Sequence, residues 1–266
     1  MPLPTTQSSS PTPINSKSYP TSYAGDSYNI SVFCATINMK NDLQEANTIY
    51  GQNKMIAHKT AYIFAGVNGA GKSTLYWNEV EKGARLGQRI NIDEIVSSFG
   101  DWRDSKDQAR AARIALKLQK SYIENGESFN QETTLCGKGI LRLFDRLKKQ
   151  DFRIYLYYVG VDSVEIAKER VKMRVAKGGH DIDESLIERR YNVSLENLTQ
   201  VLPFCDRVFL YDNSKELKEI GCIMNGEINF EQVKWLESLD LQTIKRVCRN
   251  KDIKIFKEQI SKKTKT

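Results

Sequence analysis

Residues 66–73 read Gly66-Val67-Asn68-Gly69-Ala70-Gly71-Lys72-Ser73, and Thr74 follows them. The stretch matches the pattern G-x-x-x-x-G-K-[S/T] without deviation. Its glycines allow a tight turn whose backbone N–H groups can approach phosphate oxygens, and a helix that starts near Lys72 points its positive end at the same phosphates. The motif predicts that residues 66–74 bind ATP or GTP, with Lys72 against the β- and γ-phosphates and Ser73 as a ligand of Mg²⁺.

The sequence around this motif alternates between short apolar runs and amphipathic segments. Ala61–Ala65 is a buried strand candidate directly before Gly66, and Asp162 with Glu165 indicates a helix start. The alternation predicts an α/β fold of the P-loop NTPase type, a parallel sheet flanked by helices. Expected strands are 61–65, 89–92, 128–132, 153–161 and 207–211, expected helices begin at 72 and span 105–125, 138–149, 162–177 and 183–202, and 222–224 with 227–230 should form a hairpin across Asn225-Gly226.

Composition divides the chain of 266 residues into three parts. Residues 1–57 should be a disordered or weakly ordered extension, because five of the six prolines lie there among many Ser and Thr. Residues 58–230 should form the P-loop domain. Residues 231–266 should be a helical, basic and peripheral C-terminal tail.

Charge and cysteine usage limit the function classes. The formal net charge of +7 suits a phosphate-rich partner, although a generally basic surface with a lysine-rich end would explain it as well. The five cysteines are scattered, which argues against a disulfide framework or a zinc site and favours a cytoplasmic protein with reduced thiols. We expect no membrane span and no secretory signal.

Two further segments follow predicted strands, where ligand sites of open α/β sheets gather. In Asn91-Ile92-Asp93-Glu94, Asp93 could accept the proton of an acceptor hydroxyl or hold Mg²⁺ through water, but the segment could equally be a helix cap. In Gln131–Thr134, Glu132 and Thr134 could bind substrate hydroxyls, although an ordinary strand-to-helix turn would need the same residues.

The last segment is a basic helix that ends in two glycines. Arg170 and Arg174 are four residues apart and share one helix face, and Gly178-Gly179-His180 follows them. This pattern suits a lid that closes over ATP and stabilises charge on the transferred phosphoryl group, while a solvated basic face is the simpler interpretation. Arg189 and Arg190 on the next helix could also reach the site. His180 is more typical of a structural or surface residue than of a ligand.

Taken together, these segments resemble the zeta-toxin family of P-loop kinases over roughly residues 58–230. The shared elements are the P-loop extended by Thr74, Asn91-x-Asp93-Glu94, Glu132-Thr133-Thr134, Arg170-Val-x-x-Arg174-Val-x-x-Gly-Gly-His180, Arg190-Tyr191, Ser194-Leu195-x-Asn197-Leu198 and Tyr211–Ser214. Each motif after the P-loop is weak alone, and their order and spacing make the set specific.

The resemblance implies a cytoplasmic kinase that uses ATP and Mg²⁺ to phosphorylate the 3′-hydroxyl of the sugar in UDP-N-acetylglucosamine. It implies Asp93 as the base, Glu132 and Thr134 as contacts of the nucleotide-sugar, and Arg170 and Arg174 as contacts of the phosphates or the transition state. It also implies a small helical antitoxin as partner.

The chain departs from the toxin pattern at two points. Thr133 stands where the best-understood toxins have Gly, and a second arginine of the toxin site has no unambiguous match. The Gly-Gly-His element belongs to a broader zeta-like branch, from which no substrate follows. The kinase assignment therefore transfers better than the substrate.

Two alternatives remain open. One is a kinase of another acceptor, such as a nucleotide, an antibiotic or a nucleic-acid end; the last would need a basic groove with interleaved aromatic residues, and we see no stacking platform. The other is a nucleotide-dependent switch or binding protein without acceptor chemistry. An ABC-type ATPase is disfavoured, since no L-S-G-G-Q-like signature is present.

Overall fold

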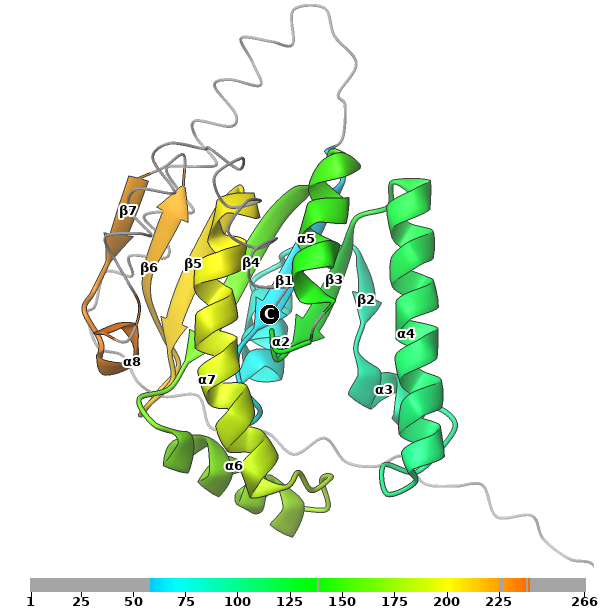
Figure 1. Cartoon of the computed structure of the whole chain (residues 1–266), viewed down its shortest axis with the longest axis vertical. Helices are drawn as coiled ribbons and strands as arrows, with labels where there is room; N and C mark the ends of the chain where they lie inside the picture. Colours follow the sequence, from blue (N-terminus) through cyan, green and yellow to red (C-terminus); the bar gives the residue numbers. More distant parts are fainter. Residues whose placement is uncertain (1–57, 138, 225–226, 238, 240–266) are drawn as a thin grey trace, which may run out of the picture.

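The computed structural model describes residues 58–137, 139–224, 227–237 and 239. These residues form a seven-stranded sheet in the order β2-β3-β1-β4-β5-β6-β7, flanked by helices (Figure 1). The strands are β1 (Thr60–Ala65), β2 (Gln88–Ile90), β3 (Phe129–Thr133), β4 (Arg153–Gly160), β5 (Arg207–Asp212), β6 (Lys218–Met224) and β7 (Glu227–Phe230). The expectations for residues 1–57 and 240–266 lie outside the described residues.

The five strands β2, β3, β1, β4 and β5 are parallel, as the alternation of strands and helices predicted. Strand β1 lies at the centre between β3 and β4, so the P-loop that follows it emerges in the middle of the sheet edge. Strands β6 and β7 add an antiparallel extension on one side. Strand β6 begins at Lys218, earlier than the expected 222, while Asn225 and Gly226 lie outside the described residues.

The helices are α2 (Lys72–Glu81), α3 (Ile92–Ser97), α4 (Ser105–Asn125), α5 (Ile140–Lys149), α6 (Val164–Ala176), α7 (Glu184–Val201) and α8 (Lys234–Glu237), with a 3₁₀ turn at Leu202–Phe204. Side chains alternate across β1: Ile63 faces a hydrophobic cluster with α4, α5 and α7, and Phe64 faces a second one with α2 and α6. Both faces of the sheet are therefore buried, and Figure 1 shows α4, α5 and α7 over the same face.

Two details at helix starts differ from the sequence expectations. Helix α6 begins after Ser163, not at Asp162, whose backbone N–H instead donates to the Ser214 hydroxyl at 2.9 Å. Strand β2 ends at Ile90, and the short helix α3 follows at once because the Asn91 side chain accepts from the backbone N–H groups of Asp93 and Glu94. Asp93 therefore lies in the first turn of a helix.

The segment after β7 returns to the core. Trp235 and Leu236 of α8 and the nearby Leu239 are buried in the same cluster as α5 and α7. The indole ring of Trp235 covers Gly160, where an added Cβ would lie 2.1 Å from a ring carbon. Trp235, Leu236 and Leu239 therefore pack into the core, so this described part of the expected C-terminal tail is not peripheral.

Candidate functional site

The P-loop (residues 66–73) has a backbone that only glycine can form at three positions. Gly66, Gly69 and Gly71 have φ angles of 139°, 79° and 105°. An added Cβ would lie 2.3 Å from the Val159 carbonyl oxygen at Gly66 and 2.5 Å from that of Ala167 at Gly69. The loop is thus shaped by positive φ angles and by close contact with β4 and α6.

Lys72 is half-buried at the start of α2, and its Nζ donates to the Val67 carbonyl oxygen at 3.1 Å. Burial lowers the pKa of Lys72, whereas the charges of Glu132 and Asp93 raise it, and those of Arg174 and Arg190 lower it. These four groups come from α3, β3, α6 and α7, so the sequence-predicted residues Asp93, Glu132 and Arg174 gather around Lys72.

Glu132, at the end of β3, connects three elements of the site. Its Oε2 accepts from the Ser73 hydroxyl at 2.8 Å, and its Oε1 accepts from Arg89 Nη2 at 2.6 Å and from Asn91 Nδ2 at 3.0 Å. The contact to Ser73 arises because β3 lies directly beside β1 in the sheet. Glu132 therefore lies against the hydroxyl that the motif assigns to Mg²⁺.

Arg89 on β2 belongs to the site, although no sequence motif contained it. Its guanidinium donates to both oxygens of Glu94 as well as to Glu132, and it lies 3.5 Å from the centre of the Tyr76 ring. Burial lowers the pKa of Arg89, but the hydrogen bonds to Glu94 and Glu132 outweigh this effect and leave it raised. What brings Arg89 to the site is the pairing of β2 with β3, which places Arg89 opposite Asn130.

Helices α6 and α7 carry three arginines of the candidate site, Arg170, Arg174 and Arg190. Arg190 Nη1 on α7 donates to the Asn68 side chain of the P-loop at 2.8 Å, and burial lowers the pKa of Arg190. Arg174 Nη2 on α6 donates to the His180 carbonyl oxygen at 3.1 Å. Among the described residues, Arg170 Nη1 and Arg174 Nε are buried nitrogens without a hydrogen-bond partner. Buried donors of this kind are available to an anionic ligand.

The loop after β5 supports the P-loop from the other side. Asn213 Nδ2 donates to the Ala70 carbonyl oxygen at 2.8 Å, and Asp212 accepts from both the Ser214 hydroxyl at 2.7 Å and Trp235 Nε1 at 3.1 Å. Arg170 Nη2 contacts the Ser214 carbonyl oxygen at 3.5 Å. Arg170 thus lies beside this loop, while Arg174 reaches toward His180.

Thr134 lies just beyond β3, and its carbonyl oxygen accepts from Cys136 Sγ at 3.0 Å. The same thiol contacts the Arg190 carbonyl oxygen at 3.1 Å, and burial raises the pKa of Cys136. Cys136 is not in a disulfide bond. Thr134 is half-buried, and its backbone makes the contact with Cys136.

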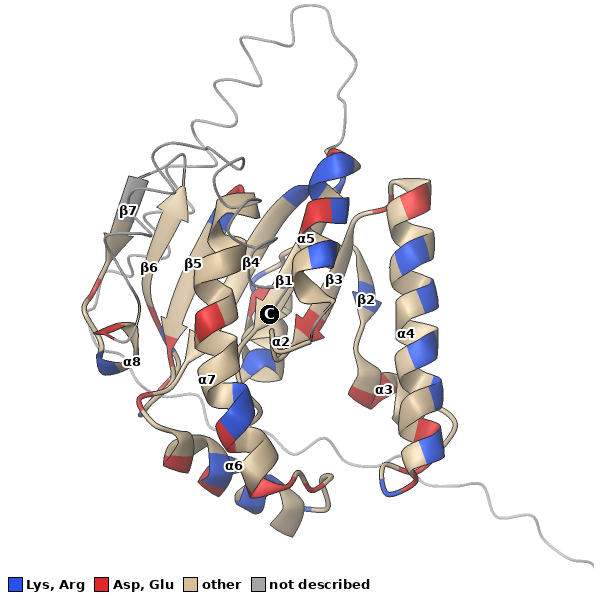
Figure 2. Ribbon diagram, in the orientation of Figure 1, with Lys and Arg blue, Asp and Glu red and all other residues tan. Residues whose placement is uncertain are grey.

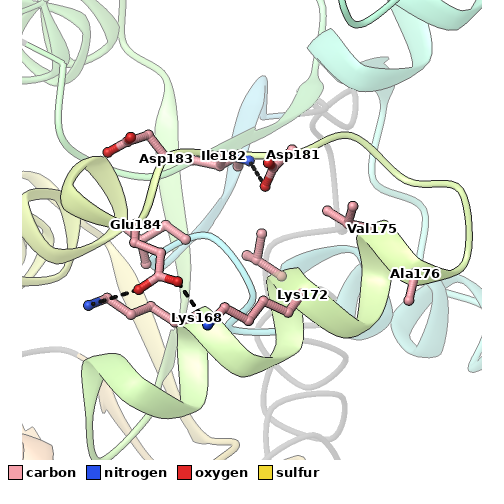
Figure 3. A pocket seen from close by; sticks show the side chains of 10 residues that line it. Lys168, Lys172, Val175, Ala176, Asp181, Ile182, Asp183 and Glu184 are labelled. Carbon is pink, nitrogen blue, oxygen red and sulfur yellow. Dashed lines mark hydrogen bonds and ion pairs between the residues drawn. The ribbon is translucent and has the colours of Figure 1, made fainter.

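A cavity of about 530 Å³ separates α6 from α7 outside the P-loop (Figure 3). One network of three ion pairs lies beside it, in which Lys168 pairs with Glu184 and Glu188, and Lys172 pairs with Glu184. The floor of the cavity includes Val171 and Ile187, which belong to the same hydrophobic cluster as the P-loop residues Val67 and Ala70. Helices α6 and α7 are thereby packed against the P-loop.

Charge is otherwise spread over the molecule: Figure 2 shows Lys and Arg along α4, α5, α6 and α7. In the described part of the chain, no group of three or more His, Cys, Asp and Glu side chains is arranged to hold a metal ion. No helix among the described residues has the length and apolar character that crossing a membrane requires.

Part of the chain is similar in sequence to known proteins. Residues 62–193 match the AAA domain family. An uncharacterized protein of Haemophilus influenzae is 31% identical over 136 residues, which are 51% of this chain and 95% of that protein.

Two solved structures are similar at low sequence identity, and the first of them has a TM-score above 0.5. The AvrRxo1-ORF1:-ORF2 complex with ATP is similar with a TM-score of 0.55 and 15% identity, over 68% of this chain and 63% of that chain, so this chain spans less than two thirds of its length. The PezAT toxin-antitoxin system of Streptococcus pneumoniae is similar with a TM-score of 0.48 and 16% identity, over 72% of this chain and 80% of that chain. The chain has a P-loop kinase-like fold of mostly parallel strands flanked by helices.

Proposed function

Because the chain belongs to the same family as the Haemophilus influenzae protein and has a P-loop kinase-like fold, we propose that it is an ATP-dependent phosphotransferase. The observation that carries the proposal is that Glu132 and Arg190, from two different elements, hydrogen-bond to Ser73 and Asn68 of the P-loop at 2.8 Å each. The charges of Asp93 and Arg174 also act on the pKa of Lys72. A mere glycine-rich turn would not require a carboxylate and a guanidinium group bonded to it. In phosphoryl transfer, catalysis consists largely of such positioning and charge stabilisation.

The residues present fit Mg²⁺ and a nucleotide. The Ser73 hydroxyl and the Glu132 carboxylate lie 2.8 Å apart and offer hard oxygen donors. Mg²⁺ binds proteins through one or two such groups, with water and phosphate oxygens completing its shell. When bound, the metal would neutralise charge on the phosphates of ATP, and Ser73 with Glu132 would hold it.

Each remaining residue of the site has a proposed role. Lys72 and the backbone of residues 66–74 hold the phosphates. Asp93 accepts the proton of the acceptor hydroxyl while that oxygen bonds to the γ-phosphorus and the bond to the β,γ-bridging oxygen breaks. Arg174, with Arg190 beside it, stabilises the charge on the transferred group, and Arg170 binds ATP on the side of Ser214.

For the acceptor, we carry the resemblance to zeta toxins further and propose a nucleotide-sugar, with UDP-N-acetylglucosamine as the first candidate. Thr134 and the face of Glu132 toward α3 would contact it. A cytoplasmic enzyme held by a small helical antitoxin completes this proposal, as do the three chain segments 1–57, 58–230 and 231–266. The structure of AvrRxo1-ORF1 was determined as a complex with ORF2 and ATP, which is compatible with a protein partner.

The test is a phosphotransfer assay of the full chain with ATP, Mg²⁺ and UDP-N-acetylglucosamine, read by mass spectrometry. We expect a product heavier by one phosphate that Lys72→Ala and Asp93→Asn both fail to form, while Asp93→Asn still binds ATP. Full activity of Asp93→Asn would refute its role as base. Steady ATP hydrolysis without this product would discard UDP-N-acetylglucosamine as the acceptor and leave other hydroxyl-bearing acceptors. ATP binding without turnover would favour a nucleotide-dependent switch or binding protein.

A further inference from the structure

Trp102 and His180 join two segments that lie far apart in the sequence. Trp102 lies in the loop between α3 and α4, and His180 lies in the loop between α6 and α7. Their rings are stacked, with centroids 4.1 Å apart and planes at 12°. The contact therefore ties the segment that follows Asp93 to the lid that carries Arg174.

His180 is also the residue that holds Arg174. Arg174 Nη2 lies 3.3 Å from His180 Nε2 and donates to the His180 carbonyl oxygen at 3.1 Å. Gly178 has a φ angle of 88°, and an added Cβ at Gly179 would lie 2.6 Å from Arg174 Cγ. The two glycines let the chain fold back over the arginine, which leaves Arg174 Nε as a buried donor without a partner among the described residues.

Trp102 is fixed by its own loop. Its carbonyl oxygen accepts from Gln108 Nε2 at 2.6 Å, and the preceding Asp101 N–H donates to Asp107 Oδ2 at 3.0 Å. Both partners lie in the first turns of α4, a helix of 21 residues. The tryptophan is thus attached to a long, packed element, whereas His180 lies on a loop that contains two glycines.

From this arrangement we infer that Trp102 is a positioning residue for phosphoryl transfer: stacking on His180, it holds Arg174 toward Lys72. The inference rests on the proposed function, because it assumes that Arg174 acts on the transferred group. A misplacement of about 1 Å in such a group can reduce turnover by about 100-fold.

The rate of ATP consumption by the full chain in the presence of Mg²⁺ tests the inference, and kcat and KM below refer to this reaction. We expect Trp102→Ala to lower kcat by about 10- to 100-fold and to change the KM for ATP less than about threefold, because the P-loop is untouched. Trp102→Phe, which keeps a stacking ring, should recover most of kcat. Phe99→Ala is the matched control: Phe99 lies in the same loop, but its ring packs against Arg110, 4.4 Å away, and its loss should leave kcat within about twofold.

A double-mutant cycle separates positioning from loosening of the fold. Trp102→Ala with His180→Ala should lower kcat no more than the stronger single variant, because both remove one contact. Additive losses, or an equal loss in Phe99→Ala, would overturn the inference.

A readout without turnover checks the contact itself. With 5-fluorotryptophan incorporated, the chain has three fluorine signals, and the one missing in Trp102→Phe belongs to Trp102. We expect His180→Ala to shift this signal more than the other two; an unchanged signal overturns the inference. If the wild-type chain consumes no ATP, the proposed function fails and the positioning role fails with it, whereas a wild-type rate that Trp102→Ala leaves unchanged overturns the inference alone.

Discussion

Lys72 is a positive charge that the fold keeps partly out of water, which costs folding free energy in the absence of ATP. Its pKa is lowered by burial, so below the lowered pKa the folded state carries a charge that the unfolded state solvates better. The cost is present at neutral pH and disappears as pH rises from the lowered pKa toward the ordinary value, because Lys72 is then neutral in both states. The P-loop is thus a site that needs its anionic ligand.

Lys72→Met should therefore raise the free energy of unfolding without nucleotide, and the gain over wild type should shrink as pH rises from the lowered pKa of Lys72 toward the ordinary lysine value. The same variant should lose the stabilisation by ATP and Mg²⁺, which at 100 times the Kd is about 2.7 kcal/mol. Urea unfolding with and without ATP measures both. Lys82→Met, at an exposed lysine paired with Glu79, is the control and should stay within about 0.5 kcal/mol. A variant less stable than wild type at neutral pH would contradict the expectation.

Glu132→Gln removes a charge and keeps the shape of the side chain. Because Glu132 accepts from Ser73 and raises the pKa of Lys72, we expect the variant to need about 10- to 100-fold more Mg²⁺ for half-maximal activity. Titration of the initial rate with Mg²⁺ at fixed ATP measures this. Glu94→Gln, which loses an ion pair to Arg89 farther from Ser73, should change the requirement much less. An equal shift in both variants would assign Glu132 a structural role only.

The sequence identified the P-loop residues individually because their motif is local. It also placed Asp93, Glu132 and Arg174 at strand ends or on a basic helix, and in the structure their charges act on the pKa of Lys72. Their catalytic roles stay predictions. Arg89 could not be found in this way, since its partners depend on which strands are neighbours. Glu132 was assigned to the substrate, whereas its contact with Ser73 favours the metal side and follows from the pairing of β1 with β3.

At the scale of elements, the P-loop packs closely against helices α6 and α7. Gly69 approaches the backbone of α6 so closely that an added Cβ would lie 2.5 Å from the Ala167 carbonyl oxygen. Val67, Ala70, Val171 and Ile187 share one hydrophobic cluster. A shift of α6 must therefore displace the P-loop, which is a physical basis for coupling the position of α6 to nucleotide binding.

Gly69→Ala tests this contact. A non-glycine residue at positive φ costs about 1–2 kcal/mol, and forced overpacking costs about 1–3 kcal/mol more. We expect both losses and no measurable ATP binding by calorimetry. Gly83→Ala is the matched control, because Gly83 has a φ angle of 88° but no atom within 4 Å of an added Cβ; it should lose only the first amount and bind ATP normally. Normal ATP binding by Gly69→Ala would refute the tight packing.

Element boundaries were predicted to within a few residues where periodicity was strong, as in α4, expected and found at residues 105–125. They were less accurate where one hydrogen bond decides. Asp162 looked like the cap of α6, but its backbone is bonded to Ser214, and the helix begins after Ser163. Helix α3 was foreseen only as a possible cap because its six residues are too few to show a period.

On the scale of the whole molecule, the C-terminal part of the described chain supports the nucleotide site. Trp235 stacks at a tilt on Tyr158, covers Gly160 and donates to Asp212. Asp212 ends β5, and the next residue, Asn213, donates to the Ala70 carbonyl oxygen of the P-loop. Composition could not reveal this link between α8 and the P-loop. Residues 231–266 are basic and polar on average, and this average does not show that Trp235 is buried in the core.

Trp235→Ala should therefore affect both stability and nucleotide binding. Removing a fully buried tryptophan costs about 3–5 kcal/mol, and release of Asp212 should weaken ATP binding through Asn213. Trp235→Phe keeps most of the packing but loses the hydrogen bond, so it should cost about 1–2 kcal/mol. Trp77→Ala, at a tryptophan that is 50% exposed, should cost less than about 1 kcal/mol. Urea unfolding and calorimetric ATP titration measure the set; if Trp235→Ala loses stability but binds ATP as tightly as wild type, the α8 segment stabilises the core without supporting the site.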